Sequence, residues 1–275
     1  MNLNAVFKSF RLDRTVPPVI LPLLGVLIIE PALNYNLIFV AVCIIISTVA
    51  GSLVNDYFDI EIDKVNKPYL PIPSGQVTKG QVKALIAGLY LISLCMSFAL
   101  SWKAGVALIA IIFIAFFYSG CVKLKGLLGE ATVSLAGAIL VPYGVFLSQK
   151  NINNVIILVT VSTFIFFVAA TVWMTIFDVD GDSKAGSKTT AVVFGVERAK
   201  LNALMIWVAG GLLTMLFLAL SKLPLLRMAI YCAVQLACCF TIYAAVKSKR
   251  YERAVANLMG LFVIVQPMIF ILGGR

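Results

Sequence analysis

Acidic residues are few in this chain, and most of them gather in two short stretches. The sequence of 275 residues holds 12 Asp and Glu against 22 Lys and Arg, with a formal net charge of +10. The stretch NDYFDIEIDK, residues 55 to 64, carries four of the 12 acids, and DVDGD, residues 178 to 182, carries three more. Each stretch follows a long apolar run, so negative charge is concentrated beside two hydrophobic segments.

The spacing of these acids predicts a site for a divalent cation. Asn55, Asp59 and Asp63 recur every four residues, as do Asp178 and Asp182, and residues four apart are neighbours on one side of a helix. Like charges at that spacing repel each other unless a cation lies between them. Oxygen ligands suit Mg²⁺ or Ca²⁺, and Mg²⁺ is typically held by one or two carboxylates plus substrate phosphates. We therefore expect Mg²⁺ at both stretches, bridged by a diphosphate; solvated loops are the alternative.

The sequence contains no His. This excludes His-based acid–base catalysis, the Ser-His-Asp relay and most zinc or haem ligation. The six Cys form no CxxC pair, and we interpret them as small packing residues.

The elements that must position the acids are membrane-spanning helices. The chain is 61% hydrophobic, with a mean hydropathy of +1.03, and an apolar run of about 20 residues is long enough to cross a bilayer. We predict nine spans, with eight as the alternative count. Their bounds are 15–30, 36–54, 82–100, 104–120, 128–147, 153–176, 199–220, 223–245 and 254–273. The predicted fold is an all-α membrane protein whose nine helices form a bundle around a central cavity, with cytoplasmic helical caps carrying the Asp motifs. Residues 1–275 would form one domain of two related halves.

The basic residues predict the orientation of these spans. With the N-terminus in the cytoplasm, most Lys and Arg fall on the cytoplasmic side, as the positive-inside rule requires. Those on the other side are Lys103, Lys150, Lys222, Arg227 and Arg275. The positive charge therefore reflects membrane topology and not binding to nucleic acid, and both acidic stretches face the cytoplasm. Residues 1–14 are predicted to form a short interfacial helix with Val6, Phe7 and Phe10 on one side.

These motifs together resemble the UbiA superfamily of intramembrane prenyltransferases. NDYFDIEID has that family's form NxxxDxxxD, and DVDGD has its form DxxxD. NKPYLPIPSG, residues 66 to 75, is similar to its NKPxRPIPSG run, and YSGCVKLKGLLGEATVSLAGA, residues 118 to 138, to its YSxxLKRxGLLGN segment. The resemblance covers the order of the spans and the loops of most of the chain. The NKPYL variant is most similar to homogentisate- and quinone-type enzymes. Membership of that branch and membership of the archaeal lipid-type branch both stay open.

The resemblance implies a metal-dependent mechanism. Asn55, Asp59, Asp63, Asp178 and Asp182 would hold Mg²⁺ against the diphosphate of an isoprenoid donor. The metal would neutralise the charge that builds on the leaving diphosphate as the allylic C–O bond breaks. A lipophilic acceptor would then attack the carbocation.

Four further residues match the family or lie near its motifs. Lys123 matches a family Lys and would contact the diphosphate. Asn55 is also expected to contact the diphosphate. Lys67 and Lys184 are expected phosphate partners, although the positive-inside rule explains both equally well. Tyr118 matches a family Tyr whose ring face would stabilise the carbocation; an interfacial aromatic is the alternative.

The sequence also departs from the family pattern. Leu70 and Leu124 stand where the family has Arg, and Glu130 stands in place of Asn. Met174-Thr175 replaces a Lys-Asp pair upstream of the second motif, and Asp180 replaces Glu. These changes leave diphosphate binding intact and leave the acceptor open.

The predicted function is Mg²⁺-dependent transfer of an isoprenoid chain from a polyprenyl diphosphate to a lipophilic acceptor at the cytoplasmic face of the cell membrane. An aromatic, quinone-like acceptor is favoured, and a glycerol-phosphate lipid is the alternative. A membrane terpene cyclase, in which the cation is captured by its own double bonds, is a second alternative. A transporter is disfavoured because the acids lie at helix ends and not in mid-span. The expected partners are the two substrates and the lipid bilayer, with no nucleic acid and no obligate protein partner.

Overall fold

The computed structural model describes residues 3–10, 12–30, 36–184, 186–220, 224–248 and 251–268. Over these ranges the chain forms helices joined by turns, and no strand is found among them. The all-α prediction is therefore confirmed for the described residues.

Seven helices in the described part of the chain are long and apolar enough to cross a membrane. Each coincides with one of the predicted spans. Their bounds are Leu37–Phe58, Lys79–Leu100, Trp102–Val122, Leu127–Leu147, Asn154–Phe177, Val196–Leu220 and Leu225–Val246. The predicted span 15–30 falls on a helix that includes a shorter apolar stretch, Val19–Ile29. The predicted span 254–273 begins within a 14-residue helix and ends outside the described residues. Nine spans, the central cavity and the cytoplasmic caps stay predictions.

The chain divides into two compact units. Unit 1 consists of Met1–Cys121 and Ile139–Asn151, and unit 2 consists of Val122–Ala138 and Ile152–Arg275. Helix α7 (Leu127–Leu147) contributes its first part to unit 2 and its last part to unit 1. The first acidic stretch therefore lies in unit 1 and the second in unit 2. One domain of two related halves stays a prediction.

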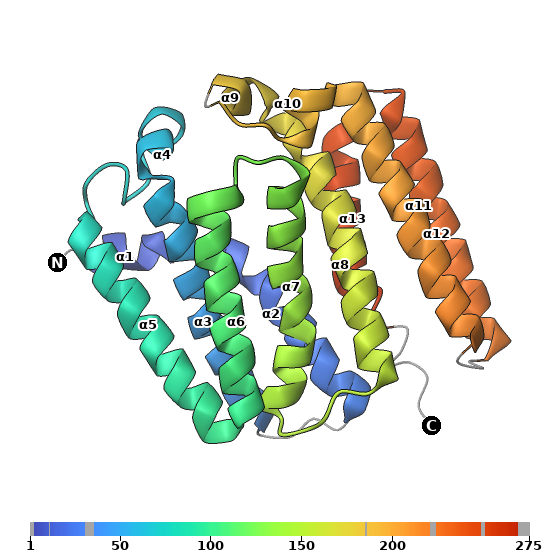
Figure 1. The fold of residues 1–275 in the computed structure, drawn as a ribbon, viewed down its shortest axis with the longest axis horizontal. Coiled ribbons are helices and arrows are strands. Elements are labelled where there is room, and N and C mark those ends of the chain that lie inside the picture. The colour runs from blue at the N-terminus through green and yellow to red at the C-terminus, as the bar shows by residue number, and fades with distance from the viewer. Residues whose placement is uncertain are drawn as a thin grey trace. The chain divides into compact units, whose positions relative to one another are not determined.

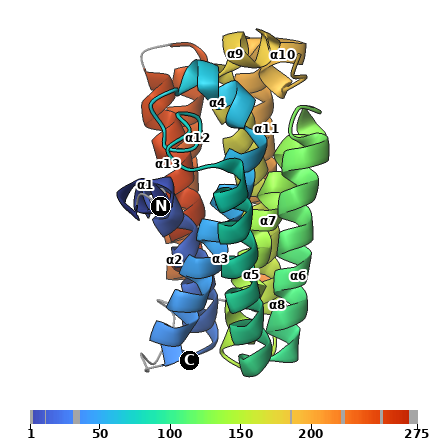
Figure 2. The same cartoon turned by 90° about the vertical axis from the view of Figure 1, so that its left-hand side faces the viewer.

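Unit 1 is built around α3. In chain order its helices are α1 (Leu3–Ser9), α2 (Leu12–Ile29), α3 (Asn36–Phe58), α4 (Ile60–Asn66), α5 (Lys79–Leu100) and α6 (Trp102–Phe117), followed by a π-helical turn at Tyr118–Val122. Helix α3 packs against α2 and α5, and α6 packs against both α5 and α3 (Figure 1). The short helix α4 extends the chain beyond the end of α3 (Figure 2). Unit 1 therefore presents the first acidic stretch at one end of its helices.

Small residues allow two helices of unit 1 to pack closely. A Cβ atom on Gly25 of α2 would lie only 2.6 Å from the carbonyl oxygen of Val141 in α7. A Cβ atom on Gly144 of α7 would meet the backbone of Pro22 in α2. Membrane helices approach each other this closely where small residues line the interface. Larger residues at either glycine would force α2 and α7 apart.

The N-terminal helix α1 supports the region of the first acidic stretch. Ala5 and Val6 are buried in an apolar core that also holds Ile60 of α4 and Ile72 of the turn after it. Phe7 is 64% exposed, and its ring packs edge-on against Phe10 with the ring centroids 5.7 Å apart, so Val6 is buried in the core while Phe7 lies at the surface. Successive residues on a helix lie about 100° apart, and Val6 and Phe7 therefore face different directions.

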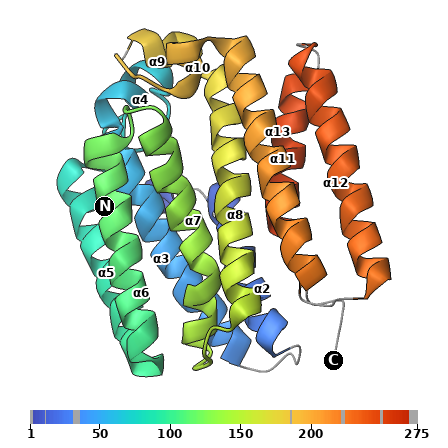
Figure 3. The same ribbon diagram turned by 45° about the vertical axis from the view of Figure 1, so that its right-hand side comes forward.

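Unit 2 is built around α8 and α11. Besides the start of α7, its helices are α8 (Asn154–Met174), a 3₁₀ turn at Thr175–Phe177, α9 (Val179–Lys184), α10 (Thr190–Phe194), α11 (Val196–Leu220), α12 (Leu225–Val246) and α13 (Glu252–Val265). Helix α8 packs along α11 and α13, and α12 packs against α11 and α13 (Figure 3). The short helices α9 and α10 lie at one end of α8 and α11 (Figure 3), where they carry the second acidic stretch.

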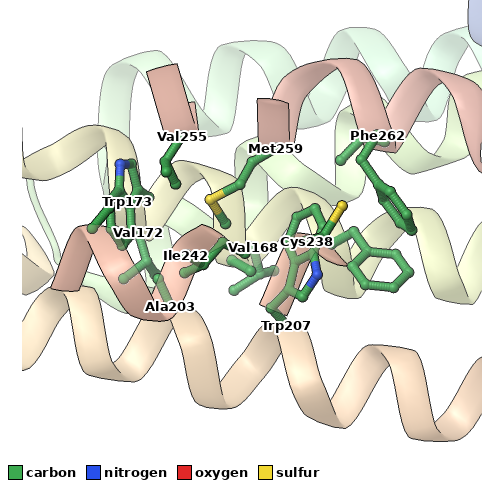
Figure 4. Packing of buried hydrophobic residues seen from close by; sticks show 14 of the residues in the cluster. Val168, Val172, Trp173, Ala203, Trp207, Cys238, Ile242, Val255, Met259 and Phe262 are labelled. Atoms are coloured by element: carbon green, nitrogen blue, oxygen red, sulfur yellow. The ribbon is translucent and has the colours of Figure 1, made fainter. Parts of the chain in front are cut away.

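Aromatic side chains fill the core of unit 2. Trp207 and Phe262 pack with their ring centroids 4.9 Å apart, and Phe166 lies 4.8 Å from Trp207 and 5.0 Å from Phe262. Figure 4 shows Trp207 and Phe262 among the aliphatic side chains of this core, with Trp173 at its other end. Such packing holds membrane helices together because lipid gives them no hydrophobic driving force to associate.

One Lys is fully buried in unit 2. Lys200 of α11 is 1% exposed, and its Nζ lies 2.7 Å from a carboxylate oxygen of Glu252 and 3.1 Å from one of Glu197. The indole N–H of Trp173 donates to the backbone carbonyl of Glu252 at 3.1 Å. Glu252 is the first residue of α13, so these contacts fix the start of α13 against α8 and α11.

Candidate active site

The first acidic stretch keeps its predicted one-turn spacing. The backbone N–H of Asp59 donates to the carbonyl of Asn55 at 3.0 Å, and that of Asp63 donates to Asp59 at 2.7 Å. The N–H of Lys67 donates in turn to Asp63 at 2.7 Å. The helix changes character at Asp59, which has φ −88° and ψ 0° and begins α4. Asn55, Asp59 and Asp63 therefore stand one turn apart along a nearly continuous helical ladder.

The Asp63 carboxylate is buried and paired. Asp63 is 5% exposed, and the ammonium of Lys67 donates to its Oδ1 at 3.3 Å. A small cleft beside it is lined by Lys8 and Ser9 of α1, by Asp56, and by the turn at residues 70–73. The predicted phosphate partner Lys67 is thus the counter-ion of a predicted metal ligand in this structure.

Glu61, in the same stretch, forms ion pairs with two Lys residues. Its carboxylate accepts hydrogen bonds from Lys64 at 2.9 Å and from Lys79 at 3.0 Å. These two ammonium groups lower the pKa of the Glu61 carboxyl below its usual value. Because both pairs are exposed, they contribute little stability. Glu61 therefore joins α4 to the start of α5.

The second acidic stretch lies where α8 has ended. Helix α8 stops at Met174, and a 3₁₀ turn leads to Asp178, which has φ −112° and ψ 8°. The backbone N–H of Asp182 donates to the carbonyl of Asp178 at 2.7 Å, so these two acids keep the predicted one-turn relation. Asp178, Asp180 and Lys184 are exposed, and Asp182 is half-buried.

The environment of Asp182 is electrostatically unusual. Its Oδ2 accepts a hydrogen bond from the Thr189 hydroxyl at 3.1 Å. Burial raises the pKa of the Asp182 carboxyl, and the neighbouring Asp178 carboxylate adds to this rise. The hydrogen bond from Thr189 and the positive charge of Lys123 lower the pKa and oppose these effects. The structure thus brings the predicted residues Lys123 and Asp178 each within electrostatic reach of Asp182.

A segment far away in sequence supports this acidic stretch. The backbone N–H of Lys188 donates to the carbonyl of Leu124 at 2.8 Å. Gly126 has φ +62°, and a Cβ atom there would collide with the carbonyl oxygen of Lys188. Glu130, which is 6% exposed, accepts hydrogen bonds from both the N–H and the hydroxyl of Thr190. Sequence reasoning missed these contacts.

Tyr118 begins the π-helical turn that ends α6. It is partly buried and belongs to unit 1, with Asn55, Asp59, Asp63 and Lys67. Single π turns occur frequently at functional sites. The predicted role of Tyr118 toward a carbocation stays a prediction.

The donor set of each stretch fits Mg²⁺ and not a softer metal. In the described part of the chain no three His, Cys, Asp or Glu side chains gather closely enough to hold a metal by themselves. Mg²⁺ needs fewer protein ligands, because it keeps several waters and takes phosphate oxygens from its substrate. Burial is the largest cause of the raised pKa of Asp182, and the neighbouring Asp178 carboxylate adds a repulsion that a bound cation would relieve.

An all-helical protein with several membrane-crossing helices, and with oxygen ligands placed one turn apart at helix ends, has the features of an enzyme that handles a diphosphate at a membrane. The model of the UbiA prenyltransferase family matches residues 19–265, and the chain belongs to this family. The resemblance stated from the motifs is therefore confirmed. The chain is a prenyltransferase and a multi-pass membrane protein.

Individual relatives agree with this assignment. The chain is 24% identical over 248 residues to the digeranylgeranylglyceryl phosphate synthase of Methanosphaera stadtmanae, covering 90% of each chain. Its fold is similar to that of a solved digeranylgeranylglyceryl phosphate synthase, with a TM-score of 0.82 and 18% identity over 98% of each chain. It is also similar to a UbiA homologue from Archaeoglobus fulgidus bound to GPP and Mg²⁺, with a TM-score of 0.71 and 17% identity over 96% of this chain and 99% of that one.

Proposed function

We propose that this prenyltransferase transfers an isoprenoid chain from a polyprenyl diphosphate to a glycerol-phosphate lipid, with Mg²⁺ as cofactor. The name of the relative from Methanosphaera stadtmanae describes a glyceryl phosphate that carries two geranylgeranyl groups. Such a product requires a geranylgeranyl donor and a glycerol-phosphate acceptor. This favours the acceptor given above as the alternative over the aromatic one.

The observation that carries the proposal is the pair of acidic stretches at helix ends. Asn55, Asp59 and Asp63 in one stretch, and Asp178 and Asp182 in the other, would hold Mg²⁺. When bound, Mg²⁺ supplies positive charge that stabilises the departing diphosphate. The solved A. fulgidus homologue bound to GPP and Mg²⁺ supports this choice of metal and donor class.

The Lys residues near these stretches would bind the diphosphate itself. Lys123 lies within electrostatic reach of Asp182, where its ammonium would also meet phosphate oxygens. Lys67 is bonded to Asp63, and a cation at Asp63 would free its ammonium for the diphosphate. Lys184, exposed at the end of α9, would be a third contact. Charge-assisted hydrogen bonds of this kind are about twice as strong as neutral ones.

The remaining chemistry needs a shielded carbocation and a nucleophile. The ring face of Tyr118 would stabilise the allylic cation. A hydroxyl oxygen of the acceptor would then bond to the cationic carbon and lose its proton to the released diphosphate or to water, which leaves an ether. No His takes part, since the chain contains none.

The proposal includes the membrane arrangement expected from the sequence. Nine helices would surround a central cavity, with the N-terminus and both acidic stretches on the cytoplasmic side of the cell membrane. The bilayer would deliver both lipid substrates, and no nucleic acid or obligate protein partner is needed.

The experiment that tests the proposal uses the full chain in detergent micelles. Geranylgeranyl diphosphate and geranylgeranylglyceryl phosphate are supplied with Mg²⁺ or with EDTA, and diphosphate and lipid products are measured. We expect an ether-linked product that requires Mg²⁺ and is lost in Asp59→Ala and Asp182→Ala. A cyclised hydrocarbon formed without acceptor would identify a terpene cyclase instead. Transfer to an aromatic acid such as homogentisate, with none to the glycerol phosphate, would overturn the acceptor.

A further inference from the structure

Glu130 is a buried carboxylate bonded to a single residue 60 positions away. It lies in the first turn of α7 and is 6% exposed. Its Oε1 accepts the backbone N–H of Thr190 at 2.8 Å, and its Oε2 accepts the Thr190 hydroxyl at 2.5 Å. Within the described residues the Glu130 carboxylate meets these two donors and pairs with no Lys or Arg.

Thr189, the residue next to Thr190, is hydrogen-bonded to the second acidic stretch. The Thr189 hydroxyl donates to Oδ2 of Asp182 at 3.1 Å, and the backbone N–H of Ser187 donates to the Asp182 carbonyl at 2.8 Å. Thr189 and Thr190 are both buried, so their side chains have little freedom to find other partners. The position of the Asp182 carboxylate thus depends on the position of residues 187–190.

We infer that Glu130 is a positioning residue that orients Asp182 through Thr190 and Thr189. This inference rests on the proposed function, in which Asp182 holds Mg²⁺ against the diphosphate. Loss of a group that orients a metal ligand by hydrogen bonding typically weakens metal binding by about 10–100-fold.

Glu is suited to this position because Thr190 offers two donors. A carboxylate presents two acceptor oxygens, one for the N–H and one for the hydroxyl, whereas an amide presents only one. Asn, which stands at this position in the UbiA pattern, presents a single acceptor oxygen to the two donors. The Glu130–Thr190 pair is therefore a matched feature of this chain.

The test separates positioning from simple stability. Purified protein in detergent is assayed for diphosphate release across a range of Mg²⁺ concentrations. We expect Glu130→Ala to raise the Mg²⁺ concentration at half-maximal rate about tenfold or more. Glu130→Gln keeps one acceptor oxygen for the N–H of Thr190, and its NH₂ group can donate to the Thr190 hydroxyl oxygen in place of the second acceptor, so this variant should lose much less than Glu130→Ala. Ser162→Ala is the control, since it removes another buried hydrogen bond of unit 2, Ser162 to Thr214 at 2.8 Å, far from Thr189 in sequence.

A double-mutant cycle tests the route through Thr189. Thr189→Val removes the hydroxyl that donates to Asp182, and Thr189→Ser keeps it. If Glu130 acts through Thr189, the Mg²⁺ shifts of Glu130→Ala and Thr189→Val will not add in the double variant. Additive shifts would contradict the inference, as would a Glu130→Gln variant as defective as Glu130→Ala. If Glu130→Ala fails to fold, the same cycle is measured with Glu130→Gln in its place, against Thr189→Val and Thr189→Ser. Non-additive shifts in the Mg²⁺ requirement again support the inference, and additive shifts contradict it.

A second readout needs neither metal nor substrate. Hydrogen exchange of metal-free protein should be faster at the amides of Ser187 and Thr190 in Glu130→Ala, and unchanged there in Ser162→Ala. Equal exchange in Glu130→Ala and wild type would overturn the inference whatever the enzyme does. If wild type shows no Mg²⁺-dependent diphosphate release, the proposed function fails. If Asp182→Ala abolishes that release while Glu130→Ala leaves the Mg²⁺ requirement unchanged, only this inference fails.

Discussion

Gly126 lies at the point where the segment after Tyr118 meets the loop that carries Thr189. Its φ of +62° is a left-handed conformation, and a Cβ atom there would collide with the Lys188 carbonyl oxygen. Gly126→Ala therefore combines two costs. Gly75→Ala is a matched control, because Gly75 has φ +78° and no atom within 4 Å of an added Cβ.

The two costs can be estimated separately. A left-handed conformation costs a residue with a Cβ about 1–2 kcal/mol, and both variants share this cost. Only Gly126→Ala must also displace Lys188, whose N–H donates to the Leu124 carbonyl at 2.8 Å; losing that hydrogen bond costs about 1 kcal/mol. We expect Gly126→Ala to lower the free energy of unfolding by about 2–3 kcal/mol, against about 1–2 kcal/mol for Gly75→Ala.

The measurement is unfolding in mixed detergent micelles titrated with SDS, with Mg²⁺-dependent diphosphate release measured on the same samples. Because Lys188 adjoins Thr189, Gly126→Ala should also raise the Mg²⁺ concentration needed for half-maximal rate, and Gly75→Ala should not. Equal losses of stability and equal Mg²⁺ requirements in the two variants would refute the argument that segment 122–130 supports the second acidic stretch.

Three further outcomes are expected. Lys67→Met removes the ammonium group that is proposed to bind the diphosphate once a cation occupies Asp63. Loss of this charge-assisted hydrogen bond should raise the KM for the prenyl diphosphate about tenfold or more, and initial rates over a range of donor concentrations check this. Lys200→Met should lower the free energy of unfolding by about 3–5 kcal/mol, because it leaves Glu252 partly buried without its ion pair. Its control, Lys64→Met, breaks only an exposed pair and should cost little; equal losses in SDS titration would disprove the distinction. Removal of Mg²⁺ with EDTA should stop diphosphate release, and added Mg²⁺ should restore it; turnover that continues in EDTA would exclude the metal from the reaction.

The spacing of the acids could be predicted from the sequence because it is a local property. Residues four apart in a helix are neighbours whatever the helix packs against, and the backbone ladders through Asp59 and through Asp182 keep that spacing. The pairing of Asp63 with Lys67 is local in the same sense. Its four-residue spacing was available in the sequence and would have predicted the ion pair.

Long-range contacts could not be predicted in this way. Nothing in the residues around Glu130 indicates that its partner is Thr190, because 60 positions and two membrane-crossing helices, α7 and α8, separate them. The one signal was an acid at the start of an apolar run where the similar family has Asn. The side of α1 that faces the protein was also beyond prediction. Val6 and Phe7 are equally apolar, and only the neighbouring core around Ile60 decides that Val6 is the buried one.

The two acidic stretches differ in how the chain compensates their charge, and this difference has a measurable consequence. Asp63 is buried against an ammonium group, so its charge is balanced before any metal binds. Burial and the nearby Asp178 carboxylate raise the pKa of the Asp182 carboxyl, and the Thr189 hydroxyl and the charge of Lys123 offset only part of this rise. A bound cation therefore compensates more unbalanced negative charge at Asp182 than at Asp63. We expect Asp182→Asn to abolish most of the rise in Tm that Mg²⁺ gives the wild type, and Asp63→Asn to abolish less of it. The reverse order would show that the ion pair with Lys67 does not substitute for the metal at Asp63.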